Sequence, residues 1–416
     1  MSIKIAVIGG GSTYTPELVS CLSGENERLD VRELWLVDPD AERREVVGAL
    51  ARRMLEEQRF SGRLEVTDVL DRALDGADVV LFQLRVGGQS ARLSDETFPL
   101  RCGCIGQETT GVGGFAKALR TVPVVLEIAE RARELSADDA WVVDFTNPVG
   151  IVVRALLDAG HRAIGLCNVA IGFEREIASI YGVEPARVRV DQVGLNHLTW
   201  IRSVLIDERD VLPEILMQHG ERLEGHTGLP SELSRLLGVL PSYYLRYFYM
   251  HDAVLEDQQV GEPRASVVAE IERELLSLYR DPALRSKPEA LERRGGAFYS
   301  EAATQLVGSL IAGSGDVQVV DVRAGEALPG FASDDVVELP ARITGSGAEP
   351  LPQPPLAPEL LGLARHVAAY ERLTAEAAVT RDRETMRRAL LAHPLIGQFP
   401  LSDELLTLLE QSEAPR

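Results

Sequence analysis

The sequence predicts an α/β fold in which a parallel-sheet domain precedes a second, α+β domain. Three observations lead to this prediction. Short apolar runs alternate with longer amphipathic segments in the first half, the first apolar run ends in a glycine-rich turn, and helical patterns dominate the second half. Strands separated by helices are typical of a parallel sheet with helices on both faces.

The first half contains four runs that are predicted to be buried strands, at residues 3–8, 33–37, 79–84 and 141–143. Amphipathic patterns at 41–58 and 116–135 predict helices between them. We expect this domain to end near residue 165, which divides the chain into domains at 1–165 and 166–416.

The second half begins with a strand-like run at 163–166 and continues with helical patterns at 173–180, 265–279 and 360–379. A proline-rich stretch precedes the last helices and is predicted to be an extended surface connector. It carries Pro350, Pro352, Pro354, Pro355 and Pro358.

Composition excludes several classes of protein. The 416 residues carry a net charge of −21, which disfavours nucleic acid because a polyphosphate needs a basic partner. Four irregularly spaced cysteines argue against a disulfide framework and fit a reducing compartment. The N-terminus lacks signal-peptide features and no apolar run could span a bilayer, so we expect a cytoplasmic protein without a membrane partner.

The glycine-rich turn is the first candidate for a binding site. A helical segment follows it from Pro16, and such a helix N-terminus offers N–H groups and a positive dipole end to a pyrophosphate. Tyr14 occupies the third glycine position of the usual fingerprint. Asp38 ends the second strand, where an acid binds a ribose hydroxyl and favours NAD over NADP. The predicted NAD site therefore comprises Gly9, Gly10, Gly11, Ser12, Thr13 and Asp38.

Cys167 and His197 both follow apolar runs, at positions where open α/β sheets build ligand sites. A thiolate and a neutral imidazole can share a divalent metal. Spacing alone favours the simpler alternative of a small buried thiol and a hydrogen-bonded core histidine. Cys102 and Cys104 lack a second cysteine pair and are interpreted as reduced structural residues.

Short motifs are spread in order over nearly the whole chain. They are GGGSTYTP at 9–16, RVGGQSAR at 85–92, GQETTGVGG at 106–114, DFTNP at 144–148, GLCNV at 165–169, GLNH at 194–197, PSYYLRY at 241–247, GAFYSEA at 296–302 and YERLTAEAAVT at 370–380. Taken together, these motifs resemble glycoside hydrolase family 4, whose members are NAD- and metal-dependent glycosidases. The resemblance implies a Rossmann-like NAD-binding domain followed by an α+β domain like that of lactate and malate dehydrogenases.

The resemblance also implies a role for individual residues. Cys167 and His197 would be ligands of Mn²⁺, and Tyr244 would be the base, with adjacent Tyr243 as the alternative. An asparagine after the metal-binding cysteine, as at Asn168, resembles the 6-phospho-β-glucosidase subgroup. That subgroup usually continues with proline, whereas this chain has Ala170. The amide of Asn168 cannot donate a proton as a carboxylic acid could, so the resemblance names no general acid. The positions that line the substrate pocket in the family are matched in this chain by Arg92, Glu108, Asn147, Asn168 and Arg264.

The implied reaction is hydrolysis of a 6-phospho-β-glucoside, and this family does not use the usual pair of carboxylates. NAD oxidises C3 of the sugar, which makes the C2 proton acidic, and Tyr244 removes that proton. The aglycone is then eliminated, water adds, and NADH returns the hydride. The partner would be a phosphorylated disaccharide or β-glucoside, with Arg264 and Arg92 binding its phosphate. Similar enzymes form homodimers or homotetramers.

Three alternatives remain open from the sequence. Within the family, the substrate could be α-linked or unphosphorylated. A plain NAD-dependent 2-hydroxyacid dehydrogenase would share the two-domain fold but would use a catalytic histidine with an aspartate partner. A catalytically silent NAD-binding regulator would keep the glycine turn, although Cys167, His197 and Tyr244 together argue against it.

Overall fold

The parallel half of the sheet occupies the N-terminal part of the computed structural model, which describes residues 2–24 and 29–413. The classic strand order of a dinucleotide-binding domain, 3-2-1-4-5-6, is present. All these strands pair in parallel. They are β1 (Ile3–Ile8), β2 (Val31–Val37), β3 (Arg63–Thr67), β4 (Val79–Phe82), β5 (Trp141–Asp144) and β6 (Ala163–Gly165).

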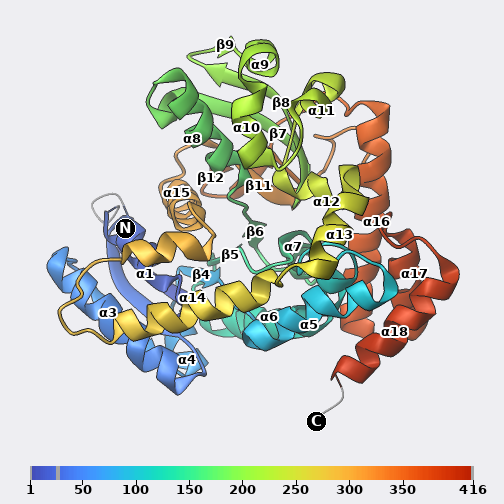
Figure 1. The fold of residues 1–416 in the computed structure, drawn as a ribbon. Helices are drawn as coiled ribbons and strands as arrows, with labels where there is room; N and C mark the ends of the chain where they lie inside the picture. Colours follow the sequence, from blue (N-terminus) through green and yellow to red (C-terminus); the bar gives the residue numbers. More distant parts are fainter. Residues whose placement is uncertain (1, 25–28, 414–416) are drawn as a thin grey trace.

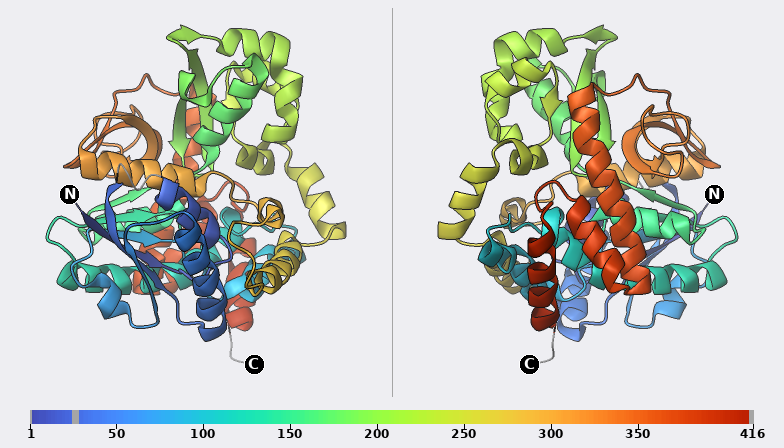
Figure 2. Two further views of the ribbon diagram at one scale, coloured as in Figure 1. Left: turned by 90° about the vertical axis from the view of Figure 1, so that its left-hand side faces the viewer. Right: turned by 90° about the vertical axis from the view of Figure 1, so that its right-hand side faces the viewer.

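Helices cover both faces of this half (Figures 1 and 2), as the sequence predicted. They are α1 (Thr15–Gly24), α3 (Ala41–Glu57), α4 (Leu70–Leu74), α5 (Gly88–Thr97), α6 (Gly111–Leu135) and α7 (Val149–Asp158). The predicted helix at 116–135 begins earlier, at Gly111, because three glycines obscure the helical pattern there. The predicted strand at 79–84 ends at Phe82, since the amide of Leu84 donates to the Thr146 hydroxyl rather than to a neighbouring strand.

An antiparallel half continues the same sheet from β6. Within the described residues the sheet has 13 strands, ordered β10-β8-β7-β12-β11-β6-β5-β4-β1-β2-β3, with β13 on β12 and β9 on β8. The second-half strands are β7 (Val188–Leu195), β8 (Leu198–Ile206), β9 (Arg209–Asp210), β10 (Leu240–Pro241), β11 (Val317–Arg323), β12 (Val336–Thr344) and β13 (Gly347–Pro350).

The helices of the second half divide between two places. The helices α8, α10 and α11 form the lobe at the top of Figure 1, whereas α14 packs on α3 and α5, and α16 packs on α6 and α7 of the first half. The predicted helices at 173–180, 265–279 and 360–379 are present with slightly wider bounds. The helices are α8 (Val169–Tyr181), α9 (Leu212–Glu214), α10 (Gly220–Thr227), α11 (Ser231–Leu237), α12 (Arg246–Tyr249), α13 (His251–Val260), α14 (Arg264–Tyr279), α15 (Tyr299–Ala312), α16 (Pro358–Thr380), α17 (Arg383–Ala392) and α18 (Phe399–Glu413).

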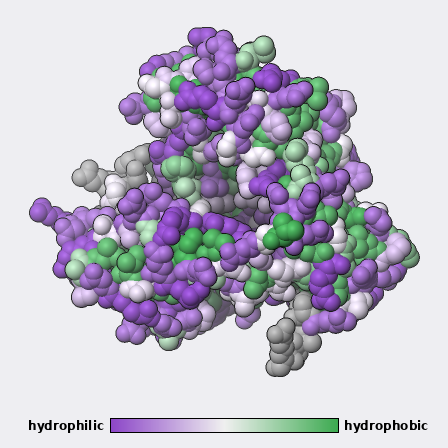
Figure 3. All heavy atoms as spheres, viewed as in Figure 1, coloured by the Kyte–Doolittle hydropathy of each residue, from purple (hydrophilic) through white to green (hydrophobic). Residues whose placement is uncertain are grey.

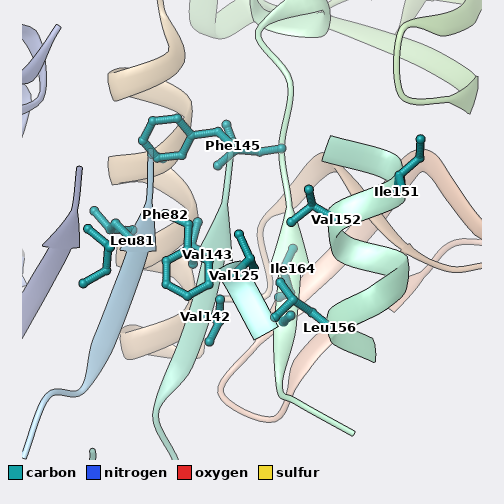
Figure 4. Close-up of a cluster of buried hydrophobic side chains, with 14 of the residues drawn as sticks. Leu81, Phe82, Val125, Val142, Val143, Phe145, Ile151, Val152, Leu156 and Ile164 are labelled. Carbon is teal, nitrogen blue, oxygen red and sulfur yellow. The ribbon is translucent and has the colours of Figure 1, made fainter. Parts of the chain in front are cut away.

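The core lies between the parallel strands and the helices that cross them. Phe82, Val143 and Ile164 come from the neighbouring strands β4, β5 and β6, and they are buried together with Val125 of α6 and Leu156 of α7 (Figure 4). Each such side chain contributes roughly 1.5–3 kcal/mol by leaving water. This packing fixes the carboxyl ends of the strands, where the candidate site lies.

A proline within α6 is accommodated by a distant side chain. Pro123 has no N–H, so the carbonyl of Leu119, four residues earlier, loses its usual helical partner. The Nη2 of Arg381, which ends α16, donates to that carbonyl at 2.8 Å. The C-terminal helices are thus joined to the N-terminal half by a bond that the proline makes necessary.

Among the described residues, every helix is too short or too polar to traverse a lipid bilayer.

Candidate active site

A cavity of about 810 Å³ opens at the carboxyl ends of β1, β2, β4 and β5. The hollow in the middle of the face shown in Figure 3 lies between the lobe of β7 and β8 and the helices of the lower half. Most residues that the sequence singled out line this cavity: Gly9, Gly11, Ser12, Asp38, Arg92, Glu108, Asn147, Tyr244 and Arg264.

The glycine turn packs tightly against the neighbouring strands. Gly9 has φ +91°, and a Cβ there would lie 2.8 Å from the Gln83 carbonyl oxygen. A Cβ on Gly10 would lie 2.7 Å from the Leu36 side chain. Gly10 and Thr13 therefore support the turn from behind, whereas Gly9, Gly11 and Ser12 face the cavity. Such a cradle suits close approach of a pyrophosphate.

Asp38 is held beside this turn by two backbone amides. Its Oδ2 accepts from Gly11 N at 2.9 Å and its Oδ1 accepts from Asp40 N at 3.0 Å. Burial raises the pKa of the Asp38 carboxyl, and the two amides oppose that rise. The carboxyl thus lies at the cavity wall after β2, the position at which a ribose hydroxyl binds in this fold.

His197 lies in the turn between β7 and β8, with φ +63°, a conformation uncommon outside glycine. Its Nδ1 is 2.8 Å from the Thr109 hydroxyl. Its Nε2 is buried and has no hydrogen-bond partner. Burial lowers the pKa of the ring to about 3, so the imidazole is neutral. A neutral ring with one nitrogen anchored and the other free is the usual state of a metal-binding histidine.

Cys167 directly follows β6, and its Sγ is 3.6 Å from the Tyr299 hydroxyl. Neither Cys167 nor His197 lines the cavity itself, but each contacts a tyrosine that does. The His197 ring stacks on Tyr244 with centroids 3.7 Å apart and an interplanar angle of 13°. The metal-ligand candidates therefore lie directly behind the aromatic wall of the cavity.

These donors fit a divalent cation that takes its other ligands from outside the protein. The described residues include no group of three or more histidine, cysteine or acidic side chains arranged to hold a metal. Burial raises the pKa of both the Cys167 thiol and the Tyr244 phenol well above their usual values, so a cation would be needed to favour the anionic forms.

The structure distinguishes the two neighbouring tyrosines. Tyr244 lines the cavity and packs on His197. Tyr243 is 38% exposed, and its hydroxyl accepts a hydrogen bond from Arg246. Only Tyr244 is in a position to meet a ligand in the cavity.

Glu108 is the centre of a charged cluster that the sequence revealed only in part. Its carboxylate pairs with Lys117 at 2.6 Å, with Arg92 at 3.2 Å and with Arg85. Although burial opposes it, these cations hold the pKa of Glu108 well below 4.5. Arg85 and Lys117 also line the cavity, and sequence reasoning missed both. The available signal was Lys117, a single charge within an apolar run.

The other predicted substrate residues differ in position. Asn147 lines the cavity, and its buried Oδ1 has no hydrogen-bond partner. Arg264 begins α14, lines the cavity, and donates to the carbonyls of Arg293 and Arg294. Asn168 does not line the cavity and instead donates to the Ala297 carbonyl at 2.8 Å.

A row of paired residues crosses the sheet below the metal-ligand candidates. Asp144, Gly165, Asp321, Glu338 and Gly194 are successive register partners on β5, β6, β11, β12 and β7. The three carboxyls are buried, and burial raises the pKa of each. The side-chain Nδ2 of Asn196, the residue before His197, donates hydrogen bonds to both Asp321 and Glu338.

The fold and this cavity define a Rossmann-type nucleotide-binding protein with an added antiparallel half. The sequence model described as Family 4 glycosyl hydrolase matches residues 4–183, and that described as Family 4 glycosyl hydrolase C-terminal domain matches residues 192–396. The chain belongs to the family 4 glycosyl hydrolases.

Two relatives illustrate the range of this family. The 6-phospho-β-glucosidase BglT of Thermotoga maritima is 36% identical over 94% of this chain and 94% of its own length. The phospho-α-glucosidase PagL of Clostridium acetobutylicum is 27% identical over 97% of this chain and 96% of its own length.

Solved structures agree with these relationships. A Thermotoga maritima 6-phospho-β-glucosidase, determined with manganese, NAD⁺ and glucose 6-phosphate, matches with a TM-score of 0.93 and 34% identity, covering 99% of this chain and 98% of that one. A lactate dehydrogenase from Cryptosporidium parvum matches with a TM-score of 0.60 at 14% identity, covering 91% and 99%. The latter likeness concerns the fold alone and confirms the predicted relation to lactate and malate dehydrogenases.

Proposed function

We propose that this protein hydrolyses 6-phospho-β-glucosides with the help of NAD and a divalent metal such as Mn²⁺. The observation that carries the proposal is that the glycine turn and Tyr244 line one cavity, and that His197, whose buried Nε2 has no partner, stacks directly on that tyrosine. The T. maritima structure with manganese, NAD⁺ and glucose 6-phosphate supports the same set of ligands.

The residues divide into three groups by the atoms they offer. Gly9, Gly11, Ser12 and Asp38 would hold NAD, with Gly10 and Thr13 shaping the turn from behind. Cys167 and His197 would hold the cation. When bound, NAD accepts and returns a hydride and the cation withdraws electron density from the sugar oxygens. With the cation favouring its phenolate form, Tyr244 would accept the C2 proton on its phenolate oxygen at the cavity wall.

The phosphate of the sugar would meet the basic side of the cavity. Arg92, Arg264, Arg85 and Lys117 line it. Glu108 and Glu96, which pairs with Arg92 at 2.7 Å, neutralise only part of their charge. An arginine fork suits a phosphate because it can donate two parallel hydrogen bonds. This excess of positive charge favours a phosphorylated sugar over an unphosphorylated one.

A β-linked substrate is favoured over an α-linked one. The 6-phospho-β-glucosidase relative is 36% identical and the phospho-α-glucosidase relative is 27% identical. Asn168 follows the candidate metal ligand, and its amide cannot act as a general acid. Its hydrogen bond to Ala297 gives it a structural role at the edge of the site.

The dehydrogenase alternative lacks its central requirement. Such an enzyme needs a histidine paired with an aspartate beside the substrate, and none of the cavity-lining residues is a histidine. His197 is anchored by the Thr109 hydroxyl instead of a carboxylate.

A panel of four chromogenic substrates tests the proposal. The nitrophenyl 6-phospho-β-glucoside, its α-anomer and the two unphosphorylated glucosides are assayed with and without NAD and Mn²⁺. We expect turnover of the phosphorylated β-glucoside alone, and only with both additions. Turnover of the unphosphorylated compounds alone would exclude the phosphate assignment, and hydrolysis without NAD would exclude the redox chemistry.

We also expect a cytoplasmic homodimer or homotetramer. No disulfide joins the four cysteines, all of which lie in the described residues, and this fits a reducing compartment. Light scattering after size-exclusion chromatography tests the assembly, and a monomer mass would contradict it.

A further inference from the structure

A second charged cluster lies beside the glycine turn, apart from the Glu108 cluster. Glu272 of α14 accepts hydrogen bonds from Arg43 at 2.8 Å, from Arg294 at 3.1 Å and from Gln89 at 3.1 Å. The Thr13 hydroxyl lies 3.2 Å from the same carboxylate. Four distant parts of the chain therefore meet on one side of the turn.

Arg294 reaches the turn from the short helix η5 (Glu289–Arg294). Its Nε donates to the Thr13 hydroxyl at 2.8 Å, and its guanidinium lies 5.7 Å from the centre of the Tyr14 ring. The side chain is 16% exposed and lines the same cavity as Gly9, Gly11 and Ser12. A guanidinium carries five N–H donors, so donors remain for a ligand after these contacts.

The charges of this cluster favour an anion. Arg43 and Arg294 carry two positive charges, and Glu272 carries one negative charge. Both arginines line the cavity. The N-terminus of α1 adds its own positive potential on the same side. The anchor on Thr13 holds Arg294 to the glycine turn, whereas Arg85 and Arg92 are held by Glu108.

We propose that Arg294 binds the pyrophosphate of the dinucleotide at the glycine turn, and that Glu272 is a positioning residue that aims it. The inference rests on the proposed function, because NAD is the ligand concerned. It adds to the glycine turn a side-chain contact from a residue that follows Thr13 by 281 positions in the chain.

The test variant is Arg294→Gln, which removes the charge and keeps a polar side chain of similar length. Glu272 would retain Arg43 and Gln89, so no buried carboxylate would be left without a partner. Arg293→Gln is the matched control. Arg293 is the preceding residue, its side chain is 56% exposed, and it pairs with Glu274 outside the cavity.

Calorimetric titrations of the full-length protein with NAD, ADP-ribose and adenosine separate the parts of the ligand. Arg294→Gln should weaken NAD and ADP-ribose by about 10- to 100-fold, as expected for loss of a hydrogen bond between charged groups. Adenosine, which lacks phosphates, should bind within about twofold of the wild type. Arg294→Lys should recover part of the loss because it restores the charge, and Arg293→Gln should bind all three ligands normally.

Three results would overturn the inference. Unchanged NAD affinity in Arg294→Gln would show that the pyrophosphate does not need this side chain. An equal loss for adenosine would show a structural role only. A loss of glucose 6-phosphate binding with NAD affinity intact would assign Arg294 to the sugar phosphate. Failure of the wild type to bind NAD would instead refute the proposed function together with this inference.

Discussion

At the scale of single residues, the contact between His197 and Thr109 determines what the imidazole can do. The Thr109 hydroxyl occupies Nδ1, so the unpartnered Nε2 is the ring atom left available to coordinate a cation. The sequence indicated the pair Cys167 and His197 only through resemblance, because spacing cannot reveal which ring nitrogen is free. The anchoring hydroxyl comes from a segment 88 residues away.

Replacing Cys167 by serine should weaken Mn²⁺ binding by at least about 10- to 100-fold, because a hydroxyl is a far poorer ligand than a thiolate. Mn²⁺ titration followed by electron paramagnetic resonance measures this affinity. NAD affinity should stay within about twofold, since the glycine turn does not contact Cys167. Cys102→Ser serves as the control and should bind Mn²⁺ normally; Mn²⁺ binding that survives in Cys167→Ser would remove Cys167 from the site.

Replacing Glu108 by glutamine should destabilise the fold by about 3–5 kcal/mol, because Arg85, Arg92 and Lys117 would lose their shared counter-charge inside the protein. Urea denaturation measures this difference. Glu410, which forms an exposed ion pair with Arg383, provides a control. Glu410→Gln should change the free energy of unfolding by less than about 1 kcal/mol.

The Glu108 contribution should depend on pH in a defined direction. Its cations lower the folded-state pKa well below the usual 4.5, so the stabilisation is complete above pH 4.5 and is lost as pH falls toward the folded pKa. The difference between wild type and Glu108→Gln should therefore be constant from pH 6 to 8 and should shrink below pH 4.5. A difference that grows on acidification would contradict this account.

At the scale of elements, the sequence predicted the strands that are almost wholly apolar, such as β4 and β5, and the helices with clear periodicity. It missed β3, in which polar residues alternate with apolar ones at the sheet edge. It also missed β11 and β12, which pair with each other as an antiparallel hairpin and join the rest of the sheet through β6 and β7, far away in the chain. Their sheet membership depends on long-range pairing that local patterns do not record.

The row of paired residues across the sheet leaves no space for a side chain at Gly165, and this can be tested. A Cβ at Gly165 would lie 2.5 Å from Val153, 2.8 Å from Val149 and 2.9 Å from Asp321. Gly165→Ala should therefore lower the free energy of unfolding by about 1–3 kcal/mol. Gly225, inside α10, has no neighbour within 4 Å of its Cβ position, so Gly225→Ala should raise it by up to about 1 kcal/mol. Thermal melts of both variants with the same sign of change would refute the argument.

At the scale of the whole molecule, one sheet passes through both halves of the chain. The proposed division at residue 165 coincides with the end of β6, where parallel pairing gives way to antiparallel pairing with β11. Sequence patterns predicted the parallel half and its ligand edge. The roles of Arg85 and Lys117 could not be predicted, because both depend on Glu108, whose contacts with them are made by folding of the first half. Arg294 could not be predicted either, because it reaches the cavity from the second half through Thr13 and Glu272.

The bond between Arg381 and α6 can be tested by a double-mutant cycle. Arg381→Gln should destabilise the protein by about 1–3 kcal/mol, because the Leu119 carbonyl would lose its donor. Pro123→Ala restores the helical N–H to that carbonyl. In the Pro123→Ala background, Arg381→Gln should therefore lower the free energy of unfolding by at least about 0.5 kcal/mol less than it does in the wild type. Equal effects in both backgrounds, measured by chemical denaturation, would show that the proline and the arginine act independently.

The proline of α6 also has a directional consequence. The carbonyl that it frees points to one side of the helix only, and α16 must present Arg381 to that side. The bond therefore helps to hold α6 at one rotation about its own axis. Lys117 lies on this helix and Glu108 just before it, so the orientation in which both face the cavity depends in part on a carbonyl outside its lining.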